Sequence, residues 1–292
     1  MQNYLFKCRQ AAYSSSHKNP TALGKGRYGT FVVTASFMLL SFVGPVSAIE
    51  LVSHEATYEM SLLSASADTQ MTGLSGRTSF SVSTDCDGWI SSEDYLMEFS
   101  YDSGESAILA SHFESWEQRT GLLYSFEVYE GSTYEEESQF SGYASLPPAA
   151  DRAAAYFSMQ PDKALPLPES VYFPIAHTQK LLEKAEKGEK LFSANIFFGA
   201  EPDRAIKRTN TVIGPEQTVA NSDILGRFAL KKFYPVQIAY FDPNSKEAVP
   251  EYEITFHLQS NGVVAYYEVD YGDFAIDAKL TDIKPISRPD CS

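Results

Sequence analysis

The sequence predicts a mainly β protein with one helix. Tyrosine and phenylalanine supply 37 of the 39 aromatic residues, and both residue types favour strands. From residue 49 onward, apolar and polar residues alternate with a period of two in runs that turn residues separate. Only one stretch repeats with helical spacing. This much antiparallel strand forms either two packed sheets or one large sheet, and a single sheet of that size must curl or close to remove its edges.

The first 48 residues have the composition of an export signal. They contain five basic residues and no acidic residue. The apolar run over 31–46 ends in Val46-Ser47-Ala48, the small-x-small pattern that signal peptidase cleaves. A membrane anchor is the alternative, but the run is interrupted by Gly44-Pro45 and is shorter than the roughly 20 residues that a spanning helix needs. We therefore expect a cleaved signal peptide over 1–48 and a periplasmic protein without a membrane span.

Charge limits the classes of partner. The whole chain has a formal charge of −15, and loss of the five basic residues of the signal would bring it to about −20. A nucleic acid is disfavoured because phosphate binding needs a basic surface. The acidic surface suits a basic or neutral partner, although solubility alone also explains it. No serine lies in a Gly-x-Ser-x-Gly elbow, and the histidines are scattered. We expect no enzymatic activity, cofactor or metal.

The first half of the exported chain predicts an antiparallel meander. Turn residues such as Asp102-Ser103-Gly104 and Glu130-Gly131-Ser132 separate the alternating runs. Residues 68–76 contain two glycines and are predicted as a turn. The predicted strands cover residues 52–62, 77–84, 94–101, 105–114, 122–129 and 139–146.

The helix follows a proline-rich stretch. Residues 147–174 hold six prolines, which central strands exclude, so this stretch is a crossing segment or a sheet edge. A helix is predicted from Pro174, with apolar residues at helical spacing through Ala185, and Gly188 is placed to end it. Its single apolar stripe must lie against a sheet. Later strands are predicted over 191–198, 228–241, 252–259, 263–271 and 274–283, which makes residues 49–292 one domain.

Two cysteines predict a disulfide. Cys8 leaves with the signal, so that Cys86 and Cys291 remain as an even pair in an exported chain. An oxidising compartment makes a bond between them the default.

Three other side chains are candidates for a cavity or a structural role. His54 occupies an inward strand position, either as a catalytic base or, more commonly, as a core residue. His177 lies in the first turn of the predicted helix, facing Phe173 and Leu181, where it could hydrogen-bond to the sheet. Trp89, with the tyrosines and phenylalanines, either lines a cavity for a lipid or another amphipathic ligand or fills the core.

Two acidic groups have alternative interpretations. Asp85 and Asp87 could act as paired carboxylates in acid–base chemistry, but turn chemistry explains both because Asp side chains bond their own backbone. Asp270, Asp273 and Asp277 form an acidic group, although a calcium site would want more carboxylates and a tighter loop.

Several strings together resemble the alphaproteobacterial cell-envelope integrity proteins of the EipB type, long known as a domain of unknown function. The resemblance covers nearly the whole exported chain, in order and with compatible spacing. The strings are Val52–Tyr58, Asp85-Cys86-Asp87-Gly88-Trp89, Leu167-Pro168 through Tyr172-Phe173-Pro174 and His177-Thr178, Ala239-Tyr240-Phe241, Pro250–Glu253, Asn261-Gly262-Val263 through Asp270–Phe274, and Cys291.

This resemblance implies a spiral-like, broken antiparallel barrel (a β-spiral) capped by the helix, with a Cys86–Cys291 disulfide. It implies a periplasmic protein that supports envelope integrity by binding a protein partner of the helical-repeat (TPR) type. The alternative function is a carrier or sensor of a lipid or another amphipathic ligand in the barrel. The chain departs from the family after the helix, where Phe198-Gly199-Ala200-Glu201 stands in place of an Asp-Gly-Ser-like turn. Gly199 preserves the turn's glycine, but the chain lacks the Asp of the family's turn.

Overall fold

The computed structural model describes residues 49–134, 136–218, 223–230 and 232–291, so the expected signal peptide over 1–48 lies outside the described residues. The described residues form one α-helix, two short 3₁₀ segments (Ala67–Thr69 and Asp223–Phe228) and sixteen strands. No helix in these ranges is both long enough and apolar enough to cross a membrane. The helix is α1 (Pro174–Glu186), and the strands are β1 (His54–Ala65), β2 (Met71–Thr84), β3 (Gly88–Tyr101), β4 (Ser106–Gln118), β5 (Leu123–Ser132), β6 (Ser138–Ser145), β7 (Ala154–Phe157), β8 (Gln160–Pro166), β9 (Val171–Tyr172), β10 (Leu191–Phe197), β11 (Ile206–Ile213), β12 (Gln217–Thr218), β13 (Lys232–Phe241), β14 (Tyr252–Leu258), β15 (Val264–Asp270) and β16 (Phe274–Pro285).

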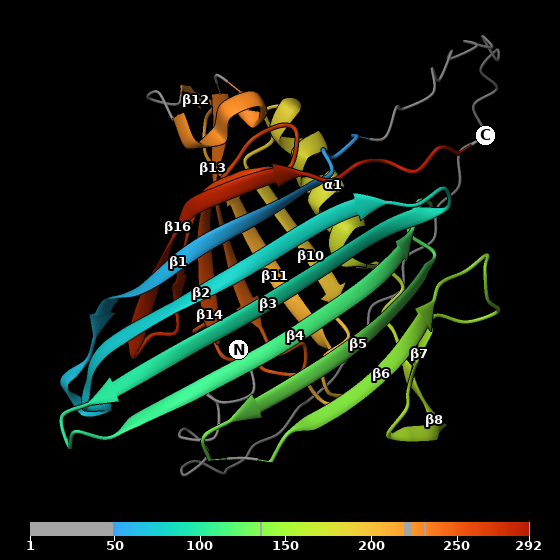
Figure 1. The fold of residues 1–292 in the computed structure, drawn as a ribbon. Helices are drawn as coiled ribbons and strands as arrows, with labels where there is room; N and C mark the ends of the chain where they lie inside the picture. The colour runs from blue at the N-terminus through green and yellow to red at the C-terminus, as the bar shows by residue number, and fades with distance from the viewer. Residues whose placement is uncertain (1–48, 135, 219–222, 231, 292) are drawn as a thin grey trace, which may run out of the picture. The chain divides into compact units, whose positions relative to one another are not determined.

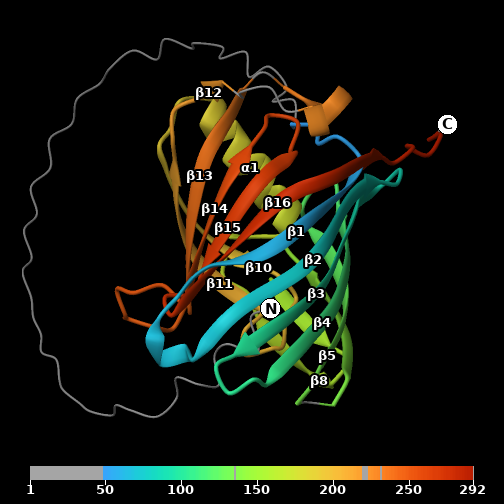
Figure 2. The ribbon, with the colours of Figure 1, turned by 60° about the vertical axis from the view of Figure 1, so that its left-hand side comes forward.

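The described strands form one large sheet that curls without closing. Its order is β8-β7-β6-β5-β4-β3-β2-β1-β16-β15-β14-β13-β11-β10-β9, and the short β12 pairs beside β13. Neighbouring strands are antiparallel except β9 and β10, which are parallel. The sheet folds back on itself, so that the arm containing β2–β5 faces the arm containing β10–β15 (Figures 1 and 2). The predicted broken barrel is therefore confirmed.

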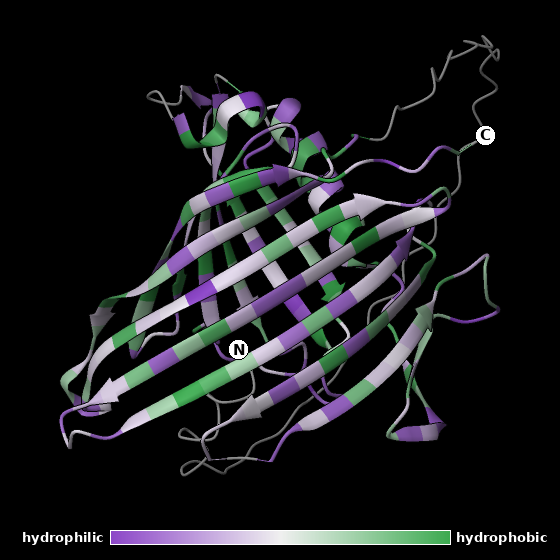
Figure 3. Ribbon diagram, in the orientation of Figure 1, coloured by the Kyte–Doolittle hydropathy of each residue, from purple (hydrophilic) through white to green (hydrophobic). Residues whose placement is uncertain are grey.

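One face of each long strand is buried inside the curl. In β1, His54, Ala56, Tyr58 and Met60 are buried, and the residues between them are more exposed. Hydrophilic and hydrophobic residues alternate along the strands nearest the viewer in Figure 3. This pattern follows from the pleat of a strand, which points successive side chains to opposite faces. His54, which the sequence analysis placed at an inward position of the first strand, is buried as predicted.

Helix α1 lies between the two arms near one end of the curl (Figures 1 and 2). Pro174 occupies its first position, and Gly188, just beyond its end, has a φ of +72°. Leu181 and Leu182 of the helix are buried in one core cluster with Val82 of β2 and Ile238 of β13. The predicted contact between the helix's apolar stripe and the sheet is confirmed.

A second core cluster fills the curl beside β5, β7 and β10, and it is largely aromatic. Tyr124 stacks on Phe173 with ring centroids 5.0 Å apart, and Phe126 meets Phe197 edge-on at 5.9 Å. Gly199 borders this cluster with a φ of +80°, and a Cβ there would lie 2.4 Å from the ring of Phe126. The turn after β10 therefore needs glycine for both its backbone conformation and the space, although the polar residue of the family's turn is absent.

The structure differs from the sequence predictions at several strands. The turn predicted over 68–76 is confined to its first residues, because β2 already begins at Met71. Gly76 belongs to that strand, and a Cβ there would lie 2.6 Å from the carbonyl oxygen of Leu96 in β3. The sequence also missed β11, whose inward positions include Lys207, Thr209 and Thr211. The strand predicted over 228–241 begins at Lys232, after the 3₁₀ segment.

A disulfide joins the β2–β3 turn to the C-terminal tail. The Cα atoms of Cys86 and Cys291 lie 5.4 Å apart, and the bond spans 205 residues of sequence. The tail before Cys291 also contacts the segment that leads into β1. Arg288 donates from its guanidinium to the carbonyl oxygen of Leu51 at 3.4 Å and pairs with Glu50 at 3.2 Å. The disulfide thus holds the tail against the start of the first strand.

We predict that the Cys86→Ser/Cys291→Ser variant keeps the far-UV circular dichroism spectrum of the parent but unfolds more easily. A cross-link over so long a loop contributes about 5 kcal/mol in the chain-entropy model, which is an upper value. Urea denaturation of the variant and the oxidised parent measures the loss. Two titratable thiols in protein isolated from an oxidising compartment would contradict the disulfide itself.

Candidate functional site

A small apolar cavity lies between the first turns of α1 and the inner face of the sheet. Its volume is about 220 Å³. Both arms of the sheet contribute to its wall, which makes it the natural candidate for a ligand site within the curl. Its lining consists of Leu51, Phe80, Val82, Pro174, Ile175, His177, Thr178, Leu181, Ile196, Phe198, Ile238, Tyr240, Ile254, Phe256, Leu258, Gly262 and Val264.

His177 of α1 contributes the imidazole in this wall. The side chain is 4% exposed, and its ring stacks on Phe192 of β10 with centroids 5.3 Å apart. Its Nε2 is buried without a hydrogen-bond partner among the described residues. Burial lowers the pKa of His177 to about 4, so the ring is neutral at pH 7. The expected hydrogen bond from this histidine to the sheet is therefore absent at Nε2, and stacking replaces it.

His54 and Trp89 lie in the surrounding core and are not part of the cavity wall. The Nδ1 of His54 donates a hydrogen bond to the carbonyl oxygen of Val52 at 2.8 Å, and burial lowers the pKa of its imidazole. Trp89 is 2% exposed, and the guanidinium of Arg119 lies 5.3 Å from its ring centroid. Of the three side chains proposed for a cavity or structural role, only His177 reaches the cavity.

Glu117 of β4 fixes the start of α1, a role that the sequence analysis missed. Phe173, at the N-cap, has no side-chain oxygen to accept from the first backbone N–H groups of the helix. The Glu117 carboxylate accepts from the N–H of Ile175 at 2.8 Å and from that of Ala176 at 2.7 Å. In the sequence, the apolar residue before Pro174 was the signal that acceptors for these N–H groups must come from another element of the fold.

Burial and hydrogen bonding shift the pKa of the Glu117 carboxyl group in opposite directions. Glu117 is 2% exposed, and burial raises its pKa to about 7, although both helix N–H groups act in the lowering direction. The protonation of Glu117 is thus coupled to the contact that holds the helix above the cavity.

The acidic groups considered in the sequence have structural partners. Asp85 accepts hydrogen bonds from the backbone N–H of Asp87 at 2.9 Å and from Trp116 Nε1 at 2.8 Å, so turn chemistry is its role. A Cβ on Gly88 would lie 2.5 Å from the carbonyl oxygen of Glu117, which explains the glycine of this turn. Asp277 pairs with Lys279. Within the described ranges, no three His, Cys, Asp or Glu side chains are placed to hold a metal ion.

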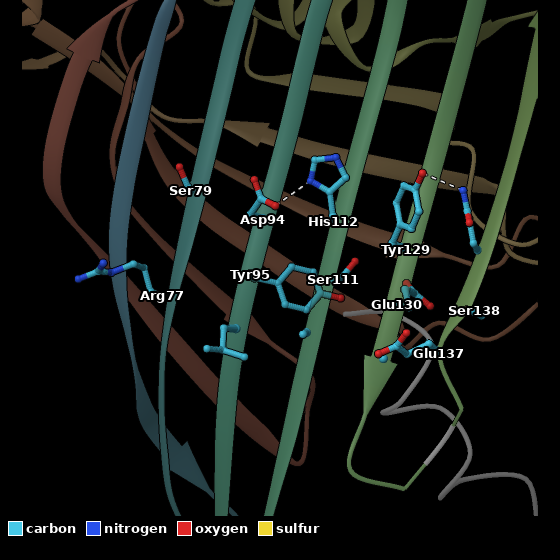
Figure 4. Close-up of a pocket in the computed structure, with 14 residues that line it drawn as sticks. Arg77, Ser79, Asp94, Tyr95, Ser111, His112, Tyr129, Glu130, Glu137 and Ser138 are labelled. Atoms are coloured by element: carbon cyan, nitrogen blue, oxygen red, sulfur yellow. Dashed lines mark hydrogen bonds and ion pairs between the residues drawn. The ribbon is translucent and has the colours of Figure 1, made fainter.

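The outer face of β2–β6 carries a second concave region, a groove of about 730 Å³. A row of facing side chains crosses it, because Ser79, Asp94, His112, Tyr129 and Gln139 are register partners on successive strands (Figure 4). His112 Nδ1 lies 2.7 Å from Asp94 Oδ1, and Gln139 Nε2 donates to the Tyr129 hydroxyl at 2.7 Å.

A second groove, of about 660 Å³, adjoins the first on β4–β8. Trp116, Tyr143 and Tyr156 line it, and the two tyrosine rings stack with centroids 5.0 Å apart. Aromatic side chains thus remain available on the outside of this arm after the inner core has been filled.

We predict that Glu117→Gln lowers the free energy of unfolding by about 1–3 kcal/mol, because the amide NH2 cannot accept from the second buried N–H, whereas both oxygens of the carboxyl group, protonated or ionised, can accept. The effect depends on pH. The folded state raises the pKa of Glu117 above its usual 4.5, so its stabilising contribution is full below pH 4.5 and is lost as pH rises through about 7. Urea titrations at pH 5 and pH 7.5 should therefore show a smaller difference between parent and variant at the higher pH.

Glu114→Gln is the matched control, since Glu114 lies on the exposed face of the same strand. It should change the free energy of unfolding by less than about 0.5 kcal/mol. Equal effects of the two substitutions would refute the anchoring role of Glu117.

Comparison with known proteins identifies a family and relatives that this chain resembles. The family model described as EipB-like matches residues 45–287. The cell envelope integrity protein EipB of Brucella abortus is 27% identical over 254 residues, which cover 85% of this chain and 90% of that protein. The crystal structure of a beta-barrel-like protein of domain of unknown function DUF1849 from Brucella abortus has a TM-score of 0.75 at 26% identity, and the match covers 82% of this chain and all of that chain. Since the family model spans most of the sequence, the chain belongs to the EipB-like family.

Proposed function

We propose that this protein supports cell-envelope integrity from the periplasm, without catalysis, by binding a periplasmic protein partner. The name of the similar protein from Brucella supports the role in the envelope. The export signal expected over residues 1–48 supports the compartment.

The observation that carries the proposal is the outer face of β3–β7, with its two adjoining grooves. We define the aromatic outer face as the four aromatic residues Trp116, Tyr129, Tyr143 and Tyr156 together with Leu96. Leu96 is 56% exposed and Tyr143 55%, in contrast to the buried residues on the inside of the same strands. Protein interfaces are enriched in tyrosine and tryptophan, which contribute large contact areas at a low cost in side-chain entropy.

Charge on this face indicates the nature of the partner. Asp94, Glu114, Glu127 and Glu137 line the two grooves, where Arg77 is the basic lining residue. Hydrogen bonds from Tyr129 and Gln139 hold the pKa of Glu127 below its usual value, which keeps this carboxylate ionised at neutral pH. A partner with a basic docking surface is complementary to this face. The resemblance to the EipB-type family implies a helical-repeat protein of the TPR type, which offers an extended surface.

We predict that a photo-crosslinking amino acid at Leu96 or Tyr143 captures the same periplasmic protein in living cells. The control position is Leu191 of β10, which is 71% exposed but lies outside the aromatic outer face. Mass spectrometry identifies the adducts. Capture from Leu191 alone, or identical adducts from all three positions, would contradict the proposed surface.

Alanine substitutions measure how much the face contributes to affinity. Tyr129→Ala and Tyr143→Ala should each weaken binding of the captured partner by at least fivefold, since buried tyrosines at interface centres typically contribute more than about 1 kcal/mol. Leu191→Ala should leave binding unchanged. Surface plasmon resonance with the purified partner makes the comparison.

A further inference from the structure

The groove on β4–β8 contains a slot that is bounded by aromatic side chains. In one row of register partners, Trp116, Ser125, Tyr143 and Tyr156 lie on the successive strands β4, β5, β6 and β7. The small side chain of Ser125 therefore lies between two large aromatic side chains on the neighbouring strands. We define these four residues as the aromatic slot, and all four line the groove of about 660 Å³.

The width of the aromatic slot limits the shape of its occupant. Trp116 and Tyr143 are separated by one intervening strand, and neighbouring strands are spaced by about 4.8 Å, so the backbones of these two residues are about 9.5 Å apart. An α-helix with its side chains is about 10–12 Å across, which is too wide to lie between the two rings. A single extended chain can lie in the slot over Ser125.

The side chains of the slot offer apolar ring faces and hydrogen-bond donors. Tyr143 is 55% exposed, and its ring stacks on that of Tyr156 with centroids 5.0 Å apart. Neither of these two hydroxyl groups hydrogen-bonds to another of the described residues, so both can donate to the carbonyl oxygens of a bound chain. Trp116 Nε1 already donates to Asp85 at 2.8 Å, which holds the indole ring in place and leaves its face for packing.

A pair of carboxylates lies two residues along the strands from the slot. Glu114 of β4 and Glu127 of β5 are register partners, and Glu127 follows Ser125 on the outer face of the same strand. Tyr129 and Gln139 donate to the Glu127 carboxylate at 2.8 and 3.0 Å, which fixes its position. Two residues of a strand span about 7 Å, close to the rise of about 6 Å for two residues of a polyproline II helix. A basic side chain two residues from a proline in the slot would therefore lie beside this pair.

We propose that the partner docks in this groove through an extended, proline-rich segment in the polyproline II conformation, with a proline over Ser125 and a lysine or arginine beside Glu114 and Glu127. Aromatic-lined grooves bind such segments because the polyproline II conformation exists before binding, which lowers the entropic cost of association. This inference rests on the proposed function and specifies the chemistry of the partner at the same face.

An oligosaccharide is the competing occupant, because sugar rings also stack on aromatic side chains. The charge of the groove favours the peptide. Glu114 and Glu127 attract a lysine or arginine, whereas a neutral sugar gains nothing from their charge.

Fluorescence anisotropy with labelled ten-residue peptides tests the chemistry of the occupant. We expect saturable binding of a hexaproline core flanked by two lysines at each end. The same lysines around a glycine–serine core, or the hexaproline core flanked by glutamates, should bind about tenfold more weakly or less. Equal binding of the three peptides, or no binding of the lysine–proline peptide, would overturn the proposal. Binding of a chitotetraose oligosaccharide without binding of this peptide would assign the groove to a glycan and also overturn it.

A set of variants tests the location of the site. Ser125→Tyr fills the slot with a residue type that suits a strand and should abolish binding of the lysine–proline peptide. Ser125→Leu serves the same purpose if the tyrosine variant does not fold. Leu191→Tyr adds the same ring on the exposed surface of β10 and should bind like the parent. Glu114→Gln/Glu127→Gln should remove the preference for the lysine-flanked over the glutamate-flanked peptide. Parent-like binding in a folded slot-filling variant contradicts the assignment.

Photo-crosslinking in cells separates this inference from the proposed function. The adduct from Tyr143 should map to a proline-rich, basic segment of the captured protein, and capture at Leu96, in the other groove, should fall about tenfold in the Ser125→Tyr background. If capture at Leu96 is unchanged in that background, or the adduct maps to a segment without proline, the slot assignment fails and the partner surface stands. If the peptide binds in solution but no periplasmic protein is captured, the chemistry of the slot is supported and the proposed function fails.

Discussion

The contact between Glu117 and the start of α1 is the constraint on which the interior of this protein depends. A sheet that curls without closing leaves an apolar inner face that other elements must cover, and α1 does so together with the 3₁₀ segment Asp223–Phe228, whose Leu225 and Phe228 are buried. The helix begins at a proline after a residue that cannot cap it, so its first free N–H groups need acceptors from outside the helix. A buried carboxylate on the opposite arm supplies both acceptors and fixes the end of the helix that borders the cavity.

The two edge strands of the open sheet are protected in different ways from pairing with other chains. At one end, β8 is exposed along almost its whole length and contains Pro161 and Pro166, which cannot donate to an added strand. At the other end, β9 is only two residues long and leads directly into α1. The proline-rich stretch, interpreted from the sequence as a crossing segment or an edge, includes the edge strand β8. Short or proline-containing edges allow a sheet of this size to remain open without pairing to other chains.

The pleat separates the inner core from the proposed partner surface. Along β2–β7, one set of side chains fills the curl, while the alternate set forms the polar row and the aromatic outer face. His112 and Phe113 are adjacent in sequence but lie on opposite faces, the first in the outer groove and the second against the inner aromatic cluster. A protein bound at the aromatic outer face would therefore contact β3–β7, whereas the cavity wall takes its strand residues from β2, β10 and β13–β15. The disulfide contributes to the inner region, because the tail that it anchors hydrogen-bonds to Leu51 in the cavity wall.

The sequence by itself determined the fold class, most strands and the helix, because a strand with one buried face shows its burial as a period of two. The first strand, with His54 inward, and the helix from Pro174 both followed from local patterns. The period of two did not reveal β11, because its inward positions include three polar residues. These are Lys207, Thr209 and Thr211, which are all buried. Lys207 is stabilised there by an ion pair with Glu251, 44 residues further along the chain. Only the tertiary structure decided the roles of Glu117 and His177. Their functions depend on contacts with distant elements, and in sequence each resembles an ordinary polar residue of a strand or a helix.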